Sequence, residues 1–239
     1  MQPSRNTLFV VLVAFDLLLS LARPAHAINE SSTHFHLEDA NGKHVANGVV
    51  ALTCENLKPN TSINEASATS EPAIMDQVDR QFVPHVLAVS VNTPVRFPNS
   101  DDIHHHVYSF SKAKPFELEL YHGATAAPVI MNNEGMVVLG CNIHDQMLGY
   151  IFVIKGQHFG VTDAQGNIEI NTSDIAPNTD CKTRVLHPQL GTPYEAPSTI
   201  IKSDSSQQII KLPMALSTTQ ENQPATGLKG VFKPKRFGQ

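Results

Sequence analysis

A short motif near the middle of the chain restricts the fold most, because it places three metal-binding types of side chain within seven residues. Cys141, His144 and Met147 follow the spacing C-x2-H-x2-M. One apolar run precedes the motif at 136–139 and another follows it at 150–154, a pattern typical of two strands joined by a short loop. The sequence therefore predicts a strand, a loop that carries the ligands, and a second strand.

The types of donor atom indicate which metal such a motif would bind. One thiolate, two imidazoles and a weak, distant thioether are the ligands of type 1 copper electron-transfer sites. A second imidazole is available upstream, in the triplet His104–His106. Zinc is the main alternative metal, because Cys and His also ligate zinc, although zinc rarely takes Met. The alternative without a metal is that these side chains are ordinary core and surface residues.

The residues around both motifs resemble the cupredoxins, specifically plastocyanin and amicyanin. The segment Phe97–Val107 reads F-P-N-S-D-D-I-H-H-H-V, and the C-x2-H-x2-M spacing is closest to that of amicyanin. In that family the first His ligand follows the Asn of a Phe-x-Asn strand end by six residues, and His105 follows Asn99 by six. The resemblance covers roughly residues 72–156. It implies four copper ligands: His105, Cys141, His144 and Met147.

Two further residues have expected roles in holding the ligands. The resemblance suggests that Asn99 fixes the His loop against the Cys loop by hydrogen bonding. His106 stands where plastocyanins often have an Asn that supports the site through hydrogen bonds. His104 and His106 themselves remain alternatives to His105 as the first ligand.

The first 27 residues predict a signal peptide. Arg5 gives a positive start, Leu8–Leu21 form an apolar stretch, and Ala25–Ala27 fit an A-x-A cleavage site. The alternative is an uncleaved anchor, although the apolar stretch is short for a membrane span. We expect the mature chain in the periplasm, with no stable membrane insertion after cleavage.

Charge argues against nucleic acid as a partner. The chain has 17 basic and 22 acidic residues, and removing Arg5, Arg23 and Asp16 with the signal peptide leaves a formal charge of −6. Nucleic-acid-binding domains are usually basic instead.

The mature sequence predicts an all-β fold. Pro and Gly separate short runs rich in Val, Ile, Thr and Phe, and no stretch sustains a helical period over three turns. We expect a Greek-key cupredoxin sandwich at 72–156. Its predicted strands are Val86–Val91, Val95–Phe97, Val107–Ser111, Phe116–Leu120, Met136–Cys141 and Tyr150–Ile154.

The flanks of this domain resemble each other. Residues 39–42 and 163–166 each form a D-A-x-G turn before a strand-like run. This resembles the transthyretin-like, carboxypeptidase-regulatory type of β-sandwich. The hypothesis is that an N-terminal β segment and loop at 28–71 pairs, through 28–56, with a C-terminal β segment at 157–216, so that the cupredoxin is inserted in a small sandwich. The alternative is a cupredoxin with decorated ends. Residues 217–239 are expected to be disordered.

The chain has three cysteines, and the copper motif takes Cys141, which must stay a thiolate. Cys54 and Cys181 remain, in a protein expected in an oxidising compartment. If the flanks form one sandwich, these two become neighbours, which predicts a disulfide. The alternative is two free buried thiols.

The resemblance implies one-electron transfer through a mononuclear type 1 copper, with transient docking to redox protein partners and no catalysis of its own. The chain is also similar to periplasmic plastocyanin-like proteins labelled as methylamine-utilisation proteins, a label that does not establish that role. Two other classes remain open: a non-redox copper-binding or delivery protein, and an adhesive or scaffold β-sandwich. Four other histidines are expected at the surface: His34, His36, His44 and His187.

Overall fold

The structure is a computed structural model that describes residues 32–55, 71–123, 127–156, 158–202 and 206–217. The predicted signal peptide at 1–27 and, apart from Ser217, the predicted disordered tail at 217–239 lie outside these residues. All regular secondary structure in the described part is β-strand, which confirms the all-β class. Within that part, no helix has the length and apolar character needed to cross a membrane.

The strands are numbered in chain order. They are β1 (Ser32–Glu38), β2 (Val49–Cys54), β3 (Ala73–Ile74), β4 (Asp76–Val78), β5 (Gln81–Val83), β6 (Val86–Ser90), β7 (Thr93–Arg96), β8 (His105–Ser109), β9 (Phe116–Tyr121), β10 (Val129–Met131), β11 (Gly135–Cys141), β12 (His144–Ile154), β13 (His158–Val161), β14 (Asn167–Asn171), β15 (Asp180–Leu186), β16 (Tyr194–Ile200) and β17 (Gln208–Lys211).

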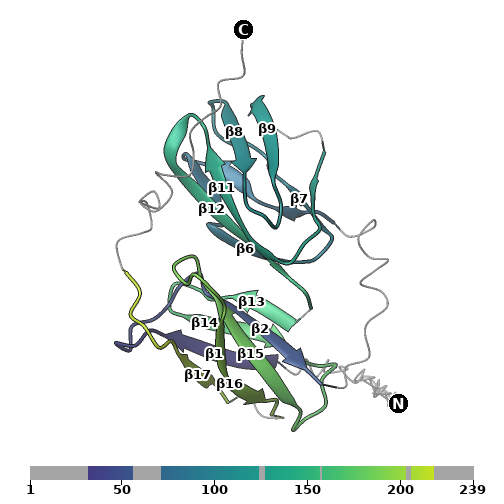
Figure 1. The fold of residues 1–239 in the computed structure, drawn as a ribbon, viewed down its shortest axis with the longest axis vertical. Coiled ribbons are helices and arrows are strands. Elements are labelled where there is room, and N and C mark those ends of the chain that lie inside the picture. The colour runs from purple at the N-terminus through teal and green to yellow at the C-terminus, as the bar shows by residue number, and fades with distance from the viewer. Residues whose placement is uncertain (1–31, 56–70, 124–126, 157, 203–205, 218–239) are drawn as a thin grey trace, which may run out of the picture.

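The upper half of the molecule in Figure 1 is built around a five-stranded sheet of order β6-β12-β11-β8-β9. A three-stranded sheet, β10-β7-β3, and the β4–β5 hairpin accompany it. All six predicted strands have a counterpart here, with shifted ends. The prediction missed β3, β4, β5 and β10, because strands of two or three residues are too short to show an alternating pattern.

The lower half combines strands from both ends of the described chain (Figure 1). One sheet has the order β13-β2-β15-β16 and the other β14-β1-β17, so strands before residue 56 share both sheets with strands after residue 157. Cys54 lies opposite Cys181 in the β2–β15 ladder, and a disulfide joins them across a Cα–Cα distance of 4.1 Å. These are the two cysteines that the sequence left for a bridge.

The repeated D-A-x-G turns have the same structure. The Asp39 carboxylate accepts the backbone N–H of Asn41 and Lys43, and Asp163 does the same two and four residues later in its own turn. Gly42 and Gly166 both adopt φ of +76°, a left-handed conformation that glycine takes at little cost. The sequence repeat is therefore a repeat of turn geometry.

The sheets stack in layers with an apolar cluster between each pair. One cluster fills the lower sandwich and another fills the upper one. A third cluster joins the two halves. It consists of Val49, Ala51, Val86, Phe152 and Ile154. Because side chains alternate along a strand, β2 and β12 each send one set of residues into a sandwich and the other set into this boundary.

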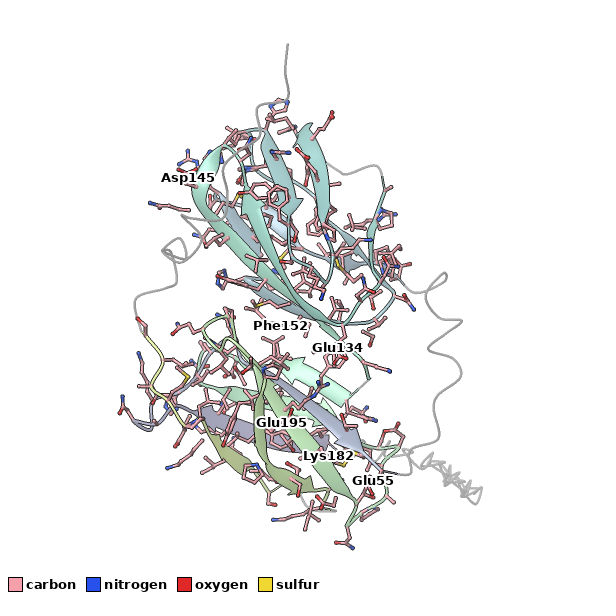
Figure 2. The ribbon with its side chains drawn as sticks, in the orientation of Figure 1. Glu55, Glu134, Asp145, Phe152, Lys182 and Glu195 are labelled. Carbon is pink, nitrogen blue, oxygen red and sulfur yellow. A yellow bond between two sulfur atoms is a disulfide. The ribbon has the colours of Figure 1, made fainter. Side chains whose placement is uncertain are left out.

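The boundary between the halves is visible in Figure 2, where Phe152 and Glu134 lie beside it. Phe152 is 2% exposed. An ion pair crosses at the rim, with Arg184 Nη2 at 3.0 Å from Glu134 Oε1. Packing against the lower half is therefore part of what buries β12, the strand that begins at the proposed ligand His144.

His187 corrects a prediction, because the structure buries it instead of exposing it. The side chain is 8% exposed, and its Nδ1 accepts the backbone N–H of Gln189 at 3.1 Å. Burial lowers the pKa of His187 to about 4, and the charge of His85 acts in the same direction, while a hydrogen bond to the backbone of Ala46 opposes them. The ring is therefore neutral in the folded protein near pH 7.

This burial predicts a loss of stability in acid. As pH falls from 6.5 to about 4, the unfolded chain protonates His187 before the folded chain does, so the free energy of unfolding falls across that window. The full loss corresponds to about 3 kcal/mol. Urea unfolding at several pH values should show a flatter dependence for His187→Gln than for the native protein. His34→Gln, a change at a partly exposed position, is the control and should keep the native slope. Equal slopes for all three proteins would contradict the prediction.

Candidate metal centre

Three side chains converge at one end of the upper sandwich. His105 begins β8, Cys141 ends β11 and His144 begins β12, and one donor atom from each lies within 4.8 Å of the other two. The Cys141 sulfur is 3.6 Å from Nδ1 of His105 and 3.7 Å from Nδ1 of His144. A thiolate and an imidazole sharing one ion lie about 3.6–3.8 Å apart. The spacing therefore fits a single metal.

Three of the four proposed ligands are buried, and the fourth is partly exposed. His105 is fully buried, Cys141 is 3% exposed and Met147 is 1% exposed in the same apolar cluster as Cys141. His144 is only partly buried. The structure thus places the thiolate and one imidazole away from water and leaves the other imidazole at the surface.

The ligand loop is shorter than the sequence predicted. Cys141 pairs with His144 in the ladder, so only Asn142 and Ile143 separate the two strands. The register shifts after Gly140, and the residues between His144 and Leu148 have no partner on β11. Such irregularities redirect side chains beside functional sites. Here the released segment contains Met147, whose side chain enters the core.

Alternation along β8 explains why His105 faces the cysteine and its neighbours do not. His105, Val107 and Ser109 are buried, whereas the residues between them are not. His104 is exposed, and its ring lies 6.0 Å from that of His122. His106 corrects a prediction, because its Nε2 contacts Glu117 Oε1 at 2.8 Å instead of supporting the ligand loop.

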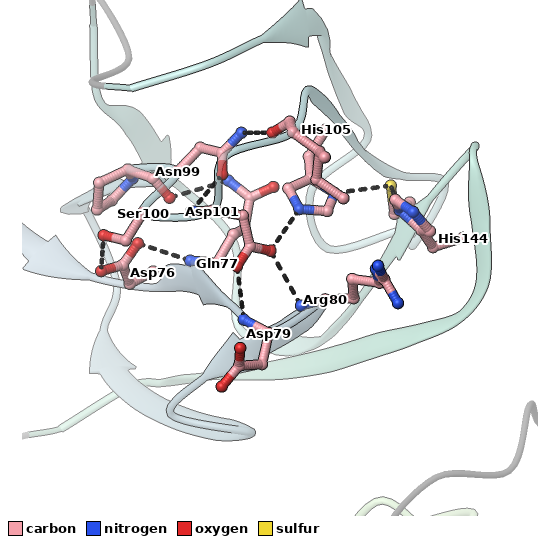
Figure 3. Close-up of polar contacts among 12 residues, drawn as sticks. Asp76, Gln77, Asp79, Arg80, Asn99, Ser100, Asp101, His105 and His144 are labelled. Atoms are coloured by element: carbon pink, nitrogen blue, oxygen red, sulfur yellow. Dashed lines mark hydrogen bonds and ion pairs between the residues drawn. The ribbon is translucent and has the colours of Figure 1, made fainter.

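Asp101 holds His105 in place, a role that sequence reasoning missed. The Nε2–H of His105 donates to Asp101 Oδ2 at 2.7 Å, and the backbone N–H groups of Asp79 and Arg80 donate to the same carboxylate (Figure 3). Burial raises the pKa of Asp101, but the hydrogen bonds from Arg80, His105 and Asp79 lower it more, so the pKa lies below its ordinary value. With Nε2 carrying the proton, Nδ1 of His105 presents a lone pair toward the sulfur.

Asn99 fastens the His loop, although not in the predicted way. Its amide donates to the carbonyls of Ile103 and Tyr121 at 2.8 and 2.9 Å, and its Oδ1 accepts the N–H of Asp101 (Figure 3). The loop is therefore tied to itself and to β9 instead of to the Cys loop. These hydrogen bonds keep Asp101 within hydrogen-bond distance of His105.

A buried polar network supports the same loop from behind. The Tyr121 hydroxyl donates to the Phe97 carbonyl at 2.6 Å, and Gln77 donates to that hydroxyl and to the Pro98 carbonyl. Burial raises the pKa of Tyr121 to about 12. The hydroxyl therefore stays protonated and keeps donating.

The β4–β5 hairpin closes the site from one side. Its turn residues Asp79 and Arg80 both have positive φ, as in the tight turns of two-residue hairpins. Gly149 lets the hairpin approach β12, because a Cβ there would come within 2.7 Å of Phe82 Cβ.

Burial, with the charges of His105 and Arg80, lowers the pKa of His144, which favours the neutral, ligating imidazole.

No protein-family model and no curated protein matches this sequence. Several solved structures are similar over part of the chain. A Cu-containing nitrite reductase from Thermus scotoductus is 25% identical, with a TM-score of 0.34, over 36% of this chain and 23% of its own length. This chain therefore spans less than a quarter of that enzyme.

Two smaller proteins are covered almost completely. A purple cupredoxin from Nitrosopumilus maritimus is 19% identical over 34% of this chain and 99% of its own, with a TM-score of 0.31. An amicyanin variant in its reduced Cu(I) form is 16% identical over 44% of this chain and 98% of its own, with a TM-score of 0.33. The structural neighbours of this chain thus include cupredoxins, and each of them matches less than half of this chain.

Proposed function

We propose that the protein is a periplasmic type 1 copper protein that transfers single electrons between redox partners. The observation that carries the proposal is the convergence of two Nδ1 atoms, at 3.6 and 3.7 Å, on the sulfur of Cys141. Copper held in this way supplies a one-electron redox couple. His105, Cys141 and His144 would form the strong ligand set, and Met147 the weak axial ligand.

The residues around these ligands support rapid electron exchange. Asp101 holds His105 by a hydrogen bond, and Asn99 and the hairpin turn hold Asp101 by hydrogen bonds of their own, so the donors need not rearrange when the oxidation state changes. Preorganised ligands keep the geometry acceptable to both states. A thiolate with two imidazoles also favours copper over harder cations.

The partly exposed ring of His144 is the proposed contact for partner proteins. Electron-transfer complexes are usually small and short-lived, so a shallow face around one imidazole edge is sufficient. The protein would act as a carrier and not as an enzyme. The disulfide between Cys54 and Cys181 supports an oxidising compartment, in line with the signal peptide expected at 1–27.

Exchange of neighbouring histidines tests the ligand assignment. His105→Ala should remove the strong visible band and the narrow copper hyperfine splitting of the Cu(II) protein, because the buried imidazole beside Cys141 is lost. His104→Ala is the matched control and should keep both, since His104 is exposed. Absorption and electron paramagnetic resonance spectra measure the two signals. A native protein whose Cu(II) form is colourless, with normal splitting, would favour non-redox copper binding instead.

A further inference from the structure

The outward face of β1, in the lower half of the molecule, carries a second group of metal-binding side chains. Phe35 and Leu37 point into the lower core, so His36 and Glu38 point away from it. A bridge between Glu38 and His44 brings the following turn back over this face. The side chains of His36 and Glu38 are not ordinary surface groups, because they are only 13% and 18% exposed.

The two imidazoles of this group face each other. Nδ1 of His44 lies 3.0 Å from Nε2 of His36, and the rings meet edge to face with centroids 4.8 Å apart. Two nitrogens bound to one tetrahedral ion of the zinc type are about 3.3 Å apart. The pair therefore needs only a small opening to share a cation.

Hydrogen bonds prepare His36 as a ligand. Its Nδ1 lies 2.8 Å from Asn167 Oδ1, and the same oxygen accepts the amide of Gln207 at 3.1 Å. Because Asn167 presents its oxygen, the ring proton of His36 sits on Nδ1. The lone pair of Nε2 then points at His44, an arrangement typical of metal-ligating histidines.

Glu38 supplies a third donor. Its Oε1 is 3.6 Å from His36 Nε2, while its Oε2 is 3.4 Å from the exposed Lys211 ammonium. Among the described residues, only the His105, Cys141 and His144 group has three donors within 4.8 Å of one another, so Glu38 must turn away from Lys211 to complete the set.

We propose that His36 Nε2, His44 Nδ1 and Glu38 form a second metal site, for a divalent cation of the zinc and Cu(II) type. Two imidazoles and a carboxylate are suitable ligands for these ions. Binding displaces the hydrogen between the two imidazoles, and a neutral His44 then carries its ring proton on Nε2. The site uses no residue of the proposed electron-transfer centre.

Titration of the mature, metal-free protein with Zn²⁺, followed by calorimetry, tests the site. The native protein should bind two equivalents of Zn²⁺. His44→Ala should weaken the binding of one equivalent by at least about tenfold, so that this equivalent is lost from the titration. His34→Ala is the matched control, on the same face of the same strand, and should keep both. Lys211→Ala should tighten the second equivalent, because Glu38 is released. A His44→Ala titration identical to the native one would overturn the proposal.

Nitrogen NMR of the imidazoles gives a second readout that does not depend on stoichiometry. Zn²⁺ should move the Nε2 resonance of His36 and the Nδ1 resonance of His44, while His36 keeps its Nδ1 proton. Unchanged resonances of both rings at saturating Zn²⁺ would also overturn it. The double variant His105→Ala/Cys141→Ser should retain the His36–His44 signals, so failure of the proposed electron-transfer centre is separable from failure of this site.

Discussion

Replacing Cys141 by Ser is expected to abolish the visible colour of the Cu(II) protein while leaving the sandwich folded. The intense band of a type 1 centre requires a thiolate bonded to copper, which a hydroxyl does not replace. Cys141 lies at the end of β11, and the ladder there uses backbone groups, so the strands do not need the sulfur. We expect the metal-free variant to stay within about 2 kcal/mol of the native stability.

Absorption and paramagnetic resonance of the copper-loaded proteins measure the effect, and circular dichroism monitors the fold. Met147→Leu is the matched control, because it keeps an apolar side chain of similar size in the core and removes only the thioether. That variant should stay coloured, since the axial ligand bonds weakly. A Cys141→Ser protein that keeps the band would show that another residue supplies the sulfur or that the centre is not of type 1.

Removing the disulfide is expected to cause the largest loss of stability. The bridge between Cys54 and Cys181 spans 127 residues, and closing so long a loop restricts the unfolded chain strongly. Cys54→Ala/Cys181→Ala should lower the free energy of unfolding of the lower half by about 3–5 kcal/mol. Alanine is chosen because Cys181 is fully buried and a serine hydroxyl there would lack water.

Denaturant unfolding of the metal-free protein, with probes in both halves, measures this loss. Cys141→Ser serves as the control for the loss of a cysteine without the loss of the bridge. The copper spectrum of the double variant should remain native at low denaturant, because the ligands all lie in the upper half. A change in unfolding free energy below about 1 kcal/mol would mean that the bridge contributes little beyond the packing around it.

The parts of the candidate centre that are close in sequence were predictable. Cys141, His144 and Met147 lie in one strand–turn–strand unit, so their neighbourhood follows from local backbone structure. The choice of His105 from three adjacent histidines needed the family spacing, and the burial alternation of β8 agrees with it. The role of the Asp101 carboxylate in holding His105 was not predictable, because the carboxylate is itself held by the backbone N–H groups of Asp79 and Arg80 in the hairpin turn.

Turn chemistry and strand composition, which act over a few residues, were enough to indicate the all-β class and the repeated D-A-x-G turns. The count of three cysteines, one of them in the copper motif, left Cys54 and Cys181 for the disulfide. The stacking of the two halves was not indicated in this way. Continuous apolar runs at 49–52 and 151–154 are consistent with strands buried on both faces, but they do not say which sheet covers the second face. Likewise, the burial of His187 arises from the packing of segments that are far apart in the sequence. Both features depend on the packing of the whole chain, since contacts between distant residues have no local signature in sequence.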